Sequence, residues 1–391
     1  MSILIGLLLL PLFGGTPPHG QNDRRRSSQF LKSLAPSAAH DARLNAAYAA
    51  LQVKSLTGAY RLSVLAEQRG ARRSDVLSLQ AQIFRDADYL DREMATLQQW
   101  TVLAPQDPLP WLKLFYIYLD LGWRHEAENA SRKAYDRAPH NPRCFVARAL
   151  LAYRSNNPSA GLPAIEMAQQ LDPTNLDLKN LHAGLLMKDL RFRDAEVKLR
   201  HILKTEPQSN INRLALAQAL LGQNKRSEAE ALLRTLLQQE PNNVEAAFQS
   251  GLLAQHRHDL PEATRLFEKA AAIDLQYSTV MWNLGHLYIQ QGRTEEGKKL
   301  LKLFSQMDTN ESDFETLLKR LETRPNDISL HYHLARFHQG AGELSQAIVE
   351  LRRVLQLHPT DSAARKDLAV VLARVGRATE SRSVSVTRTR L

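Results

Sequence analysis

The sequence has few of the residues that disulfide bonding or thiol catalysis would need. Cys144 is the single cysteine among 391 residues, so the chain cannot form an intramolecular disulfide. A catalytic thiol needs a base placed beside it, and no motif in the sequence supplies one for Cys144. We interpret Cys144 as a small side chain near the start of a helix.

Motifs of the common enzyme and metal sites are also missing. The chain has no glycine-rich phosphate loop, no HExxH motif and no GxSxG motif. His256 and His258 lie two residues apart, as do His331 and His333, so each pair would point to different faces of a helix. No cysteine or carboxylate spacing supports a metal site. We therefore expect no catalytic residue, no metal and no cofactor, and a protein that is not an enzyme.

The sequence has no apolar run long enough to span a bilayer, which takes about 20 residues. Residues 1–13 are apolar over the length of a signal-peptide core, but no Lys or Arg precedes them and Arg24, Arg25 and Arg26 follow. Three readings stay open: export, membrane association through an uncleaved N-terminus, and a cytosolic chain. We expect an exported or membrane-associated protein, with a cytoplasmic one as the alternative, and we interpret residues 1–39 as this apolar segment plus a linker.

Acidic residues are too few to balance the basic ones, and the excess of positive charge lies at the two ends. The net charge is +10, of which residues 1–40 contribute +3 and residues 362–391 contribute +5. A nucleic-acid-binding surface needs a basic stripe along one face, and the residues between the ends do not carry that charge. We expect no nucleic-acid partner, and we interpret residues 381–391 as a solvated basic tail.

The sequence does have a period of 34 residues, which is clearest in residues 278–311. There Leu284, Gly285, Gly292 and Gly297 occupy positions 7, 8, 15 and 20 of the repeat. Small residues recur at positions 8 and 20 in the other copies, with Phe115 and Glu93 as the exceptions. The small residues are Ala47, Ala81, Ala149, Ala183, Ala217, Gly251 and Gly285 at position 8, and Ala59, Ala127, Gly161, Ala195, Ala229, Ala263 and Gly297 at position 20. Position 32 carries Pro105, Pro139, Pro173, Pro207 and Pro241. A fixed period of this length is the signature of a repeat protein.

This pattern resembles the tetratricopeptide repeat family over about residues 40–380. The resemblance implies an all-α fold: a right-handed superhelical solenoid of antiparallel helix pairs, with helix A at positions 2–14 and helix B at positions 18–30. Small residues at positions 8 and 20 let the two helices cross at the usual 8–10 Å separation. Glycine at position 15 suits the left-handed conformation that ends helix A, and proline at position 32 stops helix B. Neighbouring repeats then bury their apolar faces jointly.

The phase of the pattern predicts the domain organisation. Residues 40–311 hold eight repeats without an insertion. The period breaks after residue 311, and we expect residues 312–327 to form an inserted helix. It resembles a lone helix B whose helix A is either missing or merged into the preceding helix. Residues 328–380 resume the phase with one further repeat and a partial repeat or capping helix.

The resemblance also implies where a ligand binds. In the family, helices A line a concave groove, and positions 2, 5, 9, 12 and 13 point into it. The candidate groove residues at these positions are Tyr116, Tyr153, Arg154, Phe248, Trp282, His286, Tyr332 and Arg336. Aromatic side chains mixed with amides and a few charges suit an extended peptide. We therefore expect a protein–protein interaction scaffold that binds an extended peptide or partner protein in this groove.

Two alternatives accompany this expectation. The first is an exported assembly factor for envelope or polysaccharide-secretion machinery, because an apolar N-terminus precedes the array. The second is a fragment of a transferase that contains tetratricopeptide repeats, although the array leaves little of the sequence for a catalytic domain. Position 9 never carries asparagine, so we do not expect the family's clamp for a C-terminal carboxylate.

Overall fold

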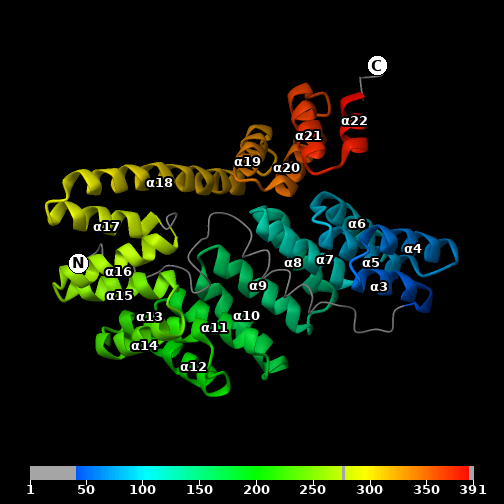
Figure 1. The fold of residues 1–391 in the computed structure, drawn as a ribbon. Coiled ribbons are helices and arrows are strands. Elements are labelled where there is room, and N and C mark those ends of the chain that lie inside the picture. The colour runs from blue at the N-terminus through cyan, green and yellow to red at the C-terminus, as the bar shows by residue number, and fades with distance from the viewer. Residues whose placement is uncertain (1–40, 275–277, 387–391) are drawn as a thin grey trace. The chain divides into compact units, whose positions relative to one another are not determined.

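The computed structural model describes residues 41–274 and 278–386, and these residues form helices and no strand. Figure 1 labels the helices. In chain order they are η1 (Ala42–Leu44), α3 (Asn45–Gln52), α4 (Leu56–Gln68), α5 (Arg73–Asp86), α6 (Leu90–Leu103), α7 (Pro108–Asp120), α8 (Arg124–Arg137), α9 (Pro142–Arg154), α10 (Pro158–Leu171), α11 (Leu176–Lys188), α12 (Phe192–Thr205), α13 (Asn210–Gly222), α14 (Arg226–Gln239), α15 (Val244–His256), α16 (Leu260–Ile273), α17 (Ser278–Gln290), α18 (Thr294–Thr323), α19 (Ile328–Gly340), α20 (Leu344–Leu357), α21 (Ser362–Arg374) and α22 (Ala378–Val386). The prediction of an all-α fold built from paired helices is confirmed. The predictions for residues 1–39 concern a part of the chain outside the described residues.

Seven helices A begin at a capping residue that repeats with the period. Asn141, for example, accepts a hydrogen bond from the backbone N–H of Arg143 at 3.0 Å, one residue after the start of α9. Such a side chain satisfies one of the N–H groups that a helix N-terminus leaves unpaired. Asp, Asn or Ser serves in the same way before α7, α11, α13, α15, α19 and α21. The start of helix A is therefore fixed locally in every one of these repeats.

The turn between helix A and helix B has the same backbone conformation in every repeat. The residue at position 15 has a positive φ in each of them. Glycine supplies it at Gly122, Gly292, Gly342 and Gly376, as the sequence predicts. The remaining repeats place another residue there: Lys54, Asp88, Asn156, Leu190, Asn224 and His258. Since the left-handed region costs a non-glycine residue roughly 1–2 kcal/mol, the packing of the hairpin imposes this turn.

The small residues at positions 8 and 20 lie where the two helices of a hairpin cross. Ala229 and Ala263 are completely buried. One crossing pairs Gly285 with Gly297, where a Cβ added to Gly297 would lie 2.6 Å from the carbonyl oxygen of Gly285. Between hairpins, apolar clusters such as Ala247, Phe267 and Leu284 fill the space from α15 to α17. The 34-residue pattern thus records the packing of each hairpin and of its neighbours.

Helix α18 corrects the expectation of a separate inserted helix at residues 312–327. It runs without a break from Thr294 to Thr323, so the expected insert is the second half of the helix B that begins at Thr294. Of the two readings left open, this is the merged one. The physical reason lies at position 32 of this repeat, where Thr309 replaces the proline of six other repeats and leaves the helix free to continue.

Helix α22 corrects the boundary of the basic tail, which the sequence places at residue 381. The helix extends from Ala378 to Val386 and forms the helix B of the last repeat against α21. The hydroxyl of Ser381 donates a hydrogen bond to the carbonyl oxygen of Ala369 at 2.7 Å, which ties the two helices together. Residues 387–391 lie outside the described part of the chain.

The described residues fall into two compact units. The central unit contains residues 140–312, with α9 to α17 and the first part of α18. The terminal unit contains two stretches far apart in the sequence, residues 41–139 and 313–386. It combines α3 to α8 with the end of α18 and with α19 to α22. The chain therefore leaves the terminal unit once, builds the central unit, and returns.

The two stretches of the terminal unit meet at α20, which packs against α6 (Figure 1), and at the end of α18, where Glu322 pairs with Arg124 at 3.0 Å. Most helices B of the array bury a single face: α14 buries three residues and α12 buries four. Helix α20 buries eight residues, including the unbroken run from Ser345 to Leu351. A second face of α20 is therefore covered, and this contact is not part of the repeat-to-repeat stacking.

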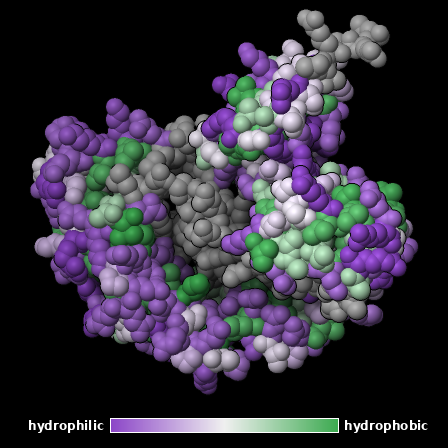
Figure 2. Space-filling model, turned by 45° about the vertical axis from the view of Figure 1, so that its right-hand side comes forward, coloured by the Kyte–Doolittle hydropathy of each residue, from purple (hydrophilic) through white to green (hydrophobic). Residues whose placement is uncertain are grey.

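The face shown in Figure 2 is mostly hydrophilic, with hydrophobic residues in small separate groups. Larger apolar side chains that reach the surface are spread over different helices, such as Val102 on α6, Met167 on α10 and Val197 on α12. Within residues 41–274 and 278–386, no helix is both long and apolar enough to cross a membrane.

Candidate functional site

The helices A of the central unit carry a set of amide and carboxylate side chains that links neighbouring repeats. Gln218 on α13 donates from Nε2 to Oε1 of Glu245 on α15, at 3.1 Å. Gln249, one turn after Glu245, donates to the same oxygen at 2.8 Å. Gln218 and Gln249 are buried, with 4% and 1% of their surface exposed. One carboxylate oxygen thus fixes the orientation of two amides from two repeats.

Two amide oxygens of these helices have no donor in the described part of the chain. They are Oδ1 of Asn180 on α11 and Oε1 of Gln249 on α15, and both atoms are buried. A buried acceptor that has lost its hydrogen bond with water costs about 1–3 kcal/mol. Such groups call for an explanation, and a ligand that brings an N–H group is one that suits amide oxygens.

Helix α17 adds an aromatic pair at positions 5 and 9 of its repeat. The rings of Trp282 and His286 lie one helical turn apart, with centroids at 4.5 Å and an interplanar angle of 62°. Trp282 is half-buried and His286 is exposed, while Val280, Met281 and Leu284 on the same helix belong to the core. The pair therefore stands at the edge of the core, where an aromatic ring contacts a partner with little loss of side-chain freedom.

A cationic group lies at the other end of this set of helices, on α9 and α11. Nζ of Lys188 donates to the backbone carbonyl of Tyr153 at 3.0 Å and sits 4.2 Å from the centroid of that tyrosine's ring. Burial lowers the pKa of Lys188, and the positive charge of Arg154 lowers it further. The arrangement places Lys188 over an aromatic face, close enough to Arg154 for the two positive charges to interact.

Most of the central unit matches a known family model in sequence. Residues 186–256 and 252–321 match the model described as tetratricopeptide repeat. The hairpins on either side of the matched residues keep the same positive-φ turn at position 15. Residues 186–321 are therefore assigned to the tetratricopeptide repeat family. No curated protein sequence matches it.

Solved structures of similar fold include other tetratricopeptide repeat proteins. One, from Parabacteroides merdae, has a TM-score of 0.49 at 14% identity, over 73% of this chain and 100% of that one. The human IFIT1 dimer with m7Gppp-AAAA has a TM-score of 0.45 at 15% identity, over 97% and 98%. YrrB, a tetratricopeptide repeat protein with an unusual peptide-binding site, has a TM-score of 0.38 at 15% identity, over 46% and 92%. At these identities the likeness concerns the fold alone.

Three of the predicted groove residues of the tetratricopeptide repeats are buried, which corrects their placement on an open surface. Phe248 is completely buried and packs against Phe267 with ring centroids at 5.8 Å. Tyr116 and Tyr153 are only 2% and 7% exposed. A large aromatic ring on helix A reaches into the space between neighbouring repeats, so the position in the repeat alone does not decide whether the ring faces outward.

The other five predicted residues retain exposed surface, but they belong to two different units. Arg154, Trp282 and His286 lie in the central unit, whereas Tyr332 and Arg336 lie on α19 of the terminal unit. The hydroxyl of Tyr332 donates to Asp367 of α21, which raises the pKa of the tyrosine to about 12 together with burial. The predicted site therefore does not form one continuous set, and the central unit holds the larger part of it.

Sequence reasoning overlooked Glu245 and Gln249, which organise the amides of the central unit. They lie at positions 2 and 6 of their repeat, four residues apart, which is the spacing that lets two side chains of one helix meet. The sequence signal for this pair was a carboxylate and an amide at this spacing on one helix. The residues between them, Ala246, Ala247 and Phe248, are buried.

Cys144 and the histidines offer no reactive or metal-binding group among the described residues. Cys144 is buried, and burial raises the pKa of its thiol to about 11, so the thiol is neutral near pH 7. No cluster of three or more His, Cys, Asp or Glu side chains within the described ranges is arranged to hold a metal ion.

Proposed function

We propose that this protein binds an extended peptide segment of a partner protein along α11, α13, α15 and α17 of the central unit. Tetratricopeptide repeats are interaction scaffolds, and their helices A give a series of equivalent positions along which an extended chain can lie. The proposal concerns binding and includes no chemical step.

The observation that carries the proposal is the pair of buried acceptors, Oδ1 of Asn180 and Oε1 of Gln249. An extended peptide presents backbone N–H groups that its own conformation leaves unpaired. Two acceptors on helices A of the same unit suit such donors without demanding a particular peptide side chain. Gln218 lies on α13, the helix A between α11 and α15, and its hydrogen bond to Glu245 of α15 keeps the region ordered before a peptide arrives.

Trp282 and His286 supply the part of the proposed site that distinguishes one peptide from another. A half-buried tryptophan next to an exposed histidine is the type of residue that dominates binding energy at interfaces. The positive side chains of Arg154 and Lys188 at the far end favour a peptide that is acidic at one terminus.

The test uses the full chain and a phage-displayed library of random short peptides. A peptide selected by the wild type, then synthesised, should bind Trp282→Ala at least about tenfold more weakly. Asn180→Leu should also bind it more weakly, yet melt at the same or a higher temperature, because it removes an acceptor that the free protein leaves unpaired. Arg265→Ala on the outer helix α16 serves as the matched control and should bind like the wild type.

Two results would contradict the proposal. One is a library that yields no peptide above background. The other is a selected peptide that binds Trp282→Ala and Asn180→Leu as tightly as the wild type while circular dichroism shows all variants folded.

As a second and separate proposal, we infer export or membrane association through the apolar residues 1–13. Assembly of an envelope complex is the role that this location would give to a peptide-binding array. Mass spectrometry of the N-terminus in the native host tests it: a mature chain that starts after the apolar run supports export, and recovery of intact Met1 in the soluble fraction contradicts both forms.

A further inference from the structure

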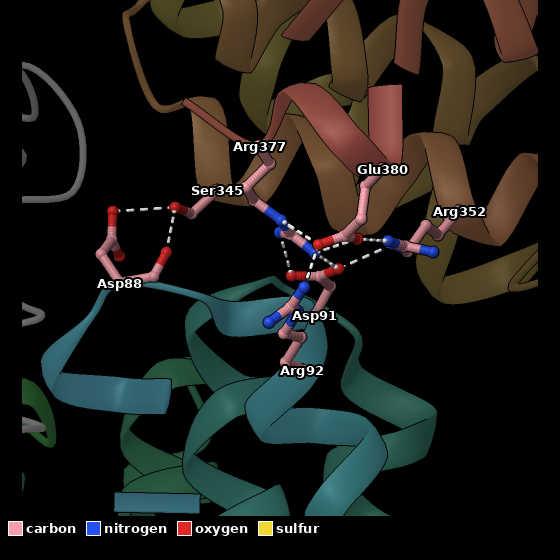
Figure 3. Close-up of polar contacts among 7 residues, drawn as sticks. All are labelled: Asp88, Asp91, Arg92, Ser345, Arg352, Arg377 and Glu380. Atoms are coloured by element: carbon pink, nitrogen blue, oxygen red, sulfur yellow. Dashed lines mark hydrogen bonds and ion pairs between the residues drawn. The ribbon is translucent and has the colours of Figure 1, made fainter. Parts of the chain in front are cut away.

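The contact between the two stretches of the terminal unit is built largely from charged side chains (Figure 3). Asp91 on α6 accepts two hydrogen bonds from Arg377, at 2.7 and 2.9 Å, and pairs with Nε of Arg352 at 2.7 Å. Glu380 on α22 pairs with Arg377 at 2.7 Å, with Arg352 at 3.1 Å and with Arg92. One carboxylate from the early repeats and one from the last repeat thus share the same arginines.

The turns of the early repeats make the neighbouring contacts. The hydroxyl of Ser345 on α20 bonds to the backbone carbonyl of Asp88 at 2.7 Å and to its side chain at 2.8 Å (Figure 3). The guanidinium of Arg377 lies 5.0 Å from the centroid of the Tyr89 ring. Asp88 and Tyr89 form the turn between α5 and α6, so the edge of this hairpin faces the C-terminal helices.

The next hairpin repeats the arrangement with Trp123, which follows the turn glycine of its repeat. Its Nε1 donates to Oε1 of Glu350 on α20 at 2.8 Å, and the other oxygen of Glu350 lies 2.6 Å from Nδ1 of His331. Arg353 lies 5.6 Å from the Trp123 ring and pairs with Glu126 at 3.3 Å. Trp123 and Glu350 are both buried, and the two residues are 227 positions apart in the sequence.

This polar contact differs in kind from the stacking of consecutive repeats. The cluster that joins α19, α20 and α21 consists of Ala335, Ile348, Leu351, Leu368 and similar apolar residues. The other face of α20 presents Ser345, Glu350, Arg352 and Arg353 to the early repeats. Contacts of this polar kind within a chain resemble transient interfaces, and relative motion is expected unless a contact is large and hydrophobic.

We propose that these contacts form a latch, the terminal latch, which holds α20 and α22 against α6 and α8 and can open without unfolding the repeats. The latch is defined by Asp88, Asp91, Trp123, Ser345, Glu350, Arg352, Arg377 and Glu380. Each side of it stays folded on its own apolar clusters when it opens. The inference goes beyond the proposed peptide binding and does not depend on it.

The connectivity of the chain means that opening the terminal latch affects the central unit. The chain enters the central unit from residue 139 and leaves it at residue 313, and both of these ends belong to the terminal unit. While the latch is closed, the two chain ends of the central unit are attached to one body. When the latch opens, they are attached to two bodies that move separately, so the latch controls how far the central unit can change its curvature.

The exposure of the ion pairs makes the latch sensitive to salt. Asp91 and Arg377 are shielded, with 6% and 3% of their side chains exposed, but Arg92 and Arg352 are 40% and 37% exposed. Salt therefore weakens the exposed ion pairs of Arg92 and Arg352 first. It screens the shielded pair of Asp91 and Arg377 only once the contact has begun to open. The Debye length falls from about 10 Å at 0.1 M to about 3 Å at 1 M ionic strength.

The experiment measures the radius of gyration of the full chain by small-angle X-ray scattering between about 0.1 M and 1 M salt. The wild type should expand as salt rises, and the double variant Asp91→Ala with Arg377→Ala should already be expanded at low salt. The milder Arg377→Lys, which loses the two-pronged contact with Asp91, should open at lower salt than the wild type. The matched control removes Glu262 and Arg265, an exposed pair on α16 in the central unit, and should follow the wild type.

Circular dichroism at each condition separates opening from unfolding. An expanded double variant with wild-type helicity supports the latch. A radius that stays equal in wild type and double variant at all salt concentrations overturns it. Loss of helicity in the double variant and in Arg377→Lys also overturns it, because the contact would then be needed for folding rather than for holding two folded parts together.

Discussion

At the scale of single residues, position 15 shows how a repeat imposes a conformation on whatever residue occupies it. Gly342 has a φ of +78° at the turn between α19 and α20, and Leu190 adopts a φ of +60° at the equivalent turn. Leu190 is 50% exposed, so burial of its side chain does not explain its place there. The two helices that the turn joins therefore set its conformation. Each repeat without a glycine at position 15 carries the backbone strain at that one residue.

Two neighbouring glycines test this reading. Gly342→Ala should destabilise the protein by about 1 kcal/mol, because alanine cannot adopt a positive φ without strain. Gly340→Ala, in the last turn of α19, should stabilise it by about 0.5 kcal/mol, because a helical alanine loses less freedom on folding. A Cβ would meet no atom within 4 Å at either position, so contacts do not distinguish the two. Chemical denaturation measures both changes, and a shift of the same sign in both variants would contradict the assignment of the turn.

His331 is the residue whose charge bears most directly on the terminal latch. Its Nδ1 lies 2.6 Å from a carboxylate oxygen of Glu350 and its Nε2 lies 2.9 Å from the carbonyl of Pro325. A carbonyl oxygen and a carboxylate both accept, so the two nitrogens satisfy both partners only when both carry a proton. Burial acts to lower the pKa of His331, but the hydrogen bond and charge of Glu350 outweigh it and raise the pKa above the ordinary 6.5.

The pH dependence of stability follows from this raised pKa. The stabilisation from charged His331 is complete below about pH 6.5 and is lost as the pH rises through the higher pKa of the folded state. Relative to His331→Gln, the wild type should therefore gain most stability near pH 6 and less at alkaline pH. The negative charge of Glu350 raises the pKa of His331, and the positive charge of Arg353 lowers it. Trp123 contacts the imidazole ring edge-on. Melting curves of both proteins over this range measure the difference, and a constant difference would contradict a charged His331.

At the scale of elements, α18 shows that a repeat without the proline at position 32 can extend its helix B. Six repeats have a proline at position 32, after helix B, and the repeat of α18 has Thr309 there. The helix continues to Thr323 and carries the chain from the central unit into the terminal unit. The side chain of Leu318 on this extension reaches Gly122, where an added Cβ would lie 2.6 Å from it. The extension thus belongs to the packing of the terminal unit.

Restoring the proline of the other repeats tests the continuity of α18. Thr309→Pro should destabilise the protein by about 3 kcal/mol, because proline in a helix interior removes a hydrogen bond and clashes with the preceding turn. Thr309→Ala is the matched control and should be close to neutral. Urea unfolding monitored by circular dichroism gives both values. Equal stability of the two variants would show that the helix already ends near residue 309.

At the scale of the whole molecule, the sequence predicts what repeats and misses what does not. Positions 8, 15, 20 and 32 recur with the period because each hairpin meets the same neighbours, so helix pairs, turns and crossings follow from the pattern. The terminal latch joins residues more than 200 positions apart, such as Trp123 and Glu350, and no periodic signal connects them. The break in the period after residue 311 is visible in the sequence. The sequence does not decide whether a helix is missing there or is merged into the preceding one, and the structure shows one continuous helix, α18.

A local signal for the latch is nevertheless present at position 16, directly after the turn. The repeats of the central unit place polar residues there, including Asn157, Arg191 and Lys225, whereas the early repeats place Tyr89 and Trp123. Two aromatic residues at an exposed turn indicate a covered surface. The same reasoning did not work for Tyr116 and Phe248, because an aromatic side chain on helix A fits either a groove or the core between repeats. The candidate peptide site was therefore only partly predictable.

Native-state hydrogen exchange of the wild type and Arg377→Ala tests most directly that residues 41–139 and 313–386 form one unit. Breaking a buried ion pair costs several kcal/mol, so protection should fall at least about tenfold. We predict that it falls in α6 and α8 as well as in α20 and α22, while α11 to α15 of the central unit keep theirs. A fall confined to the helices next to Arg377 in sequence, with α6 and α8 unchanged, would contradict the account.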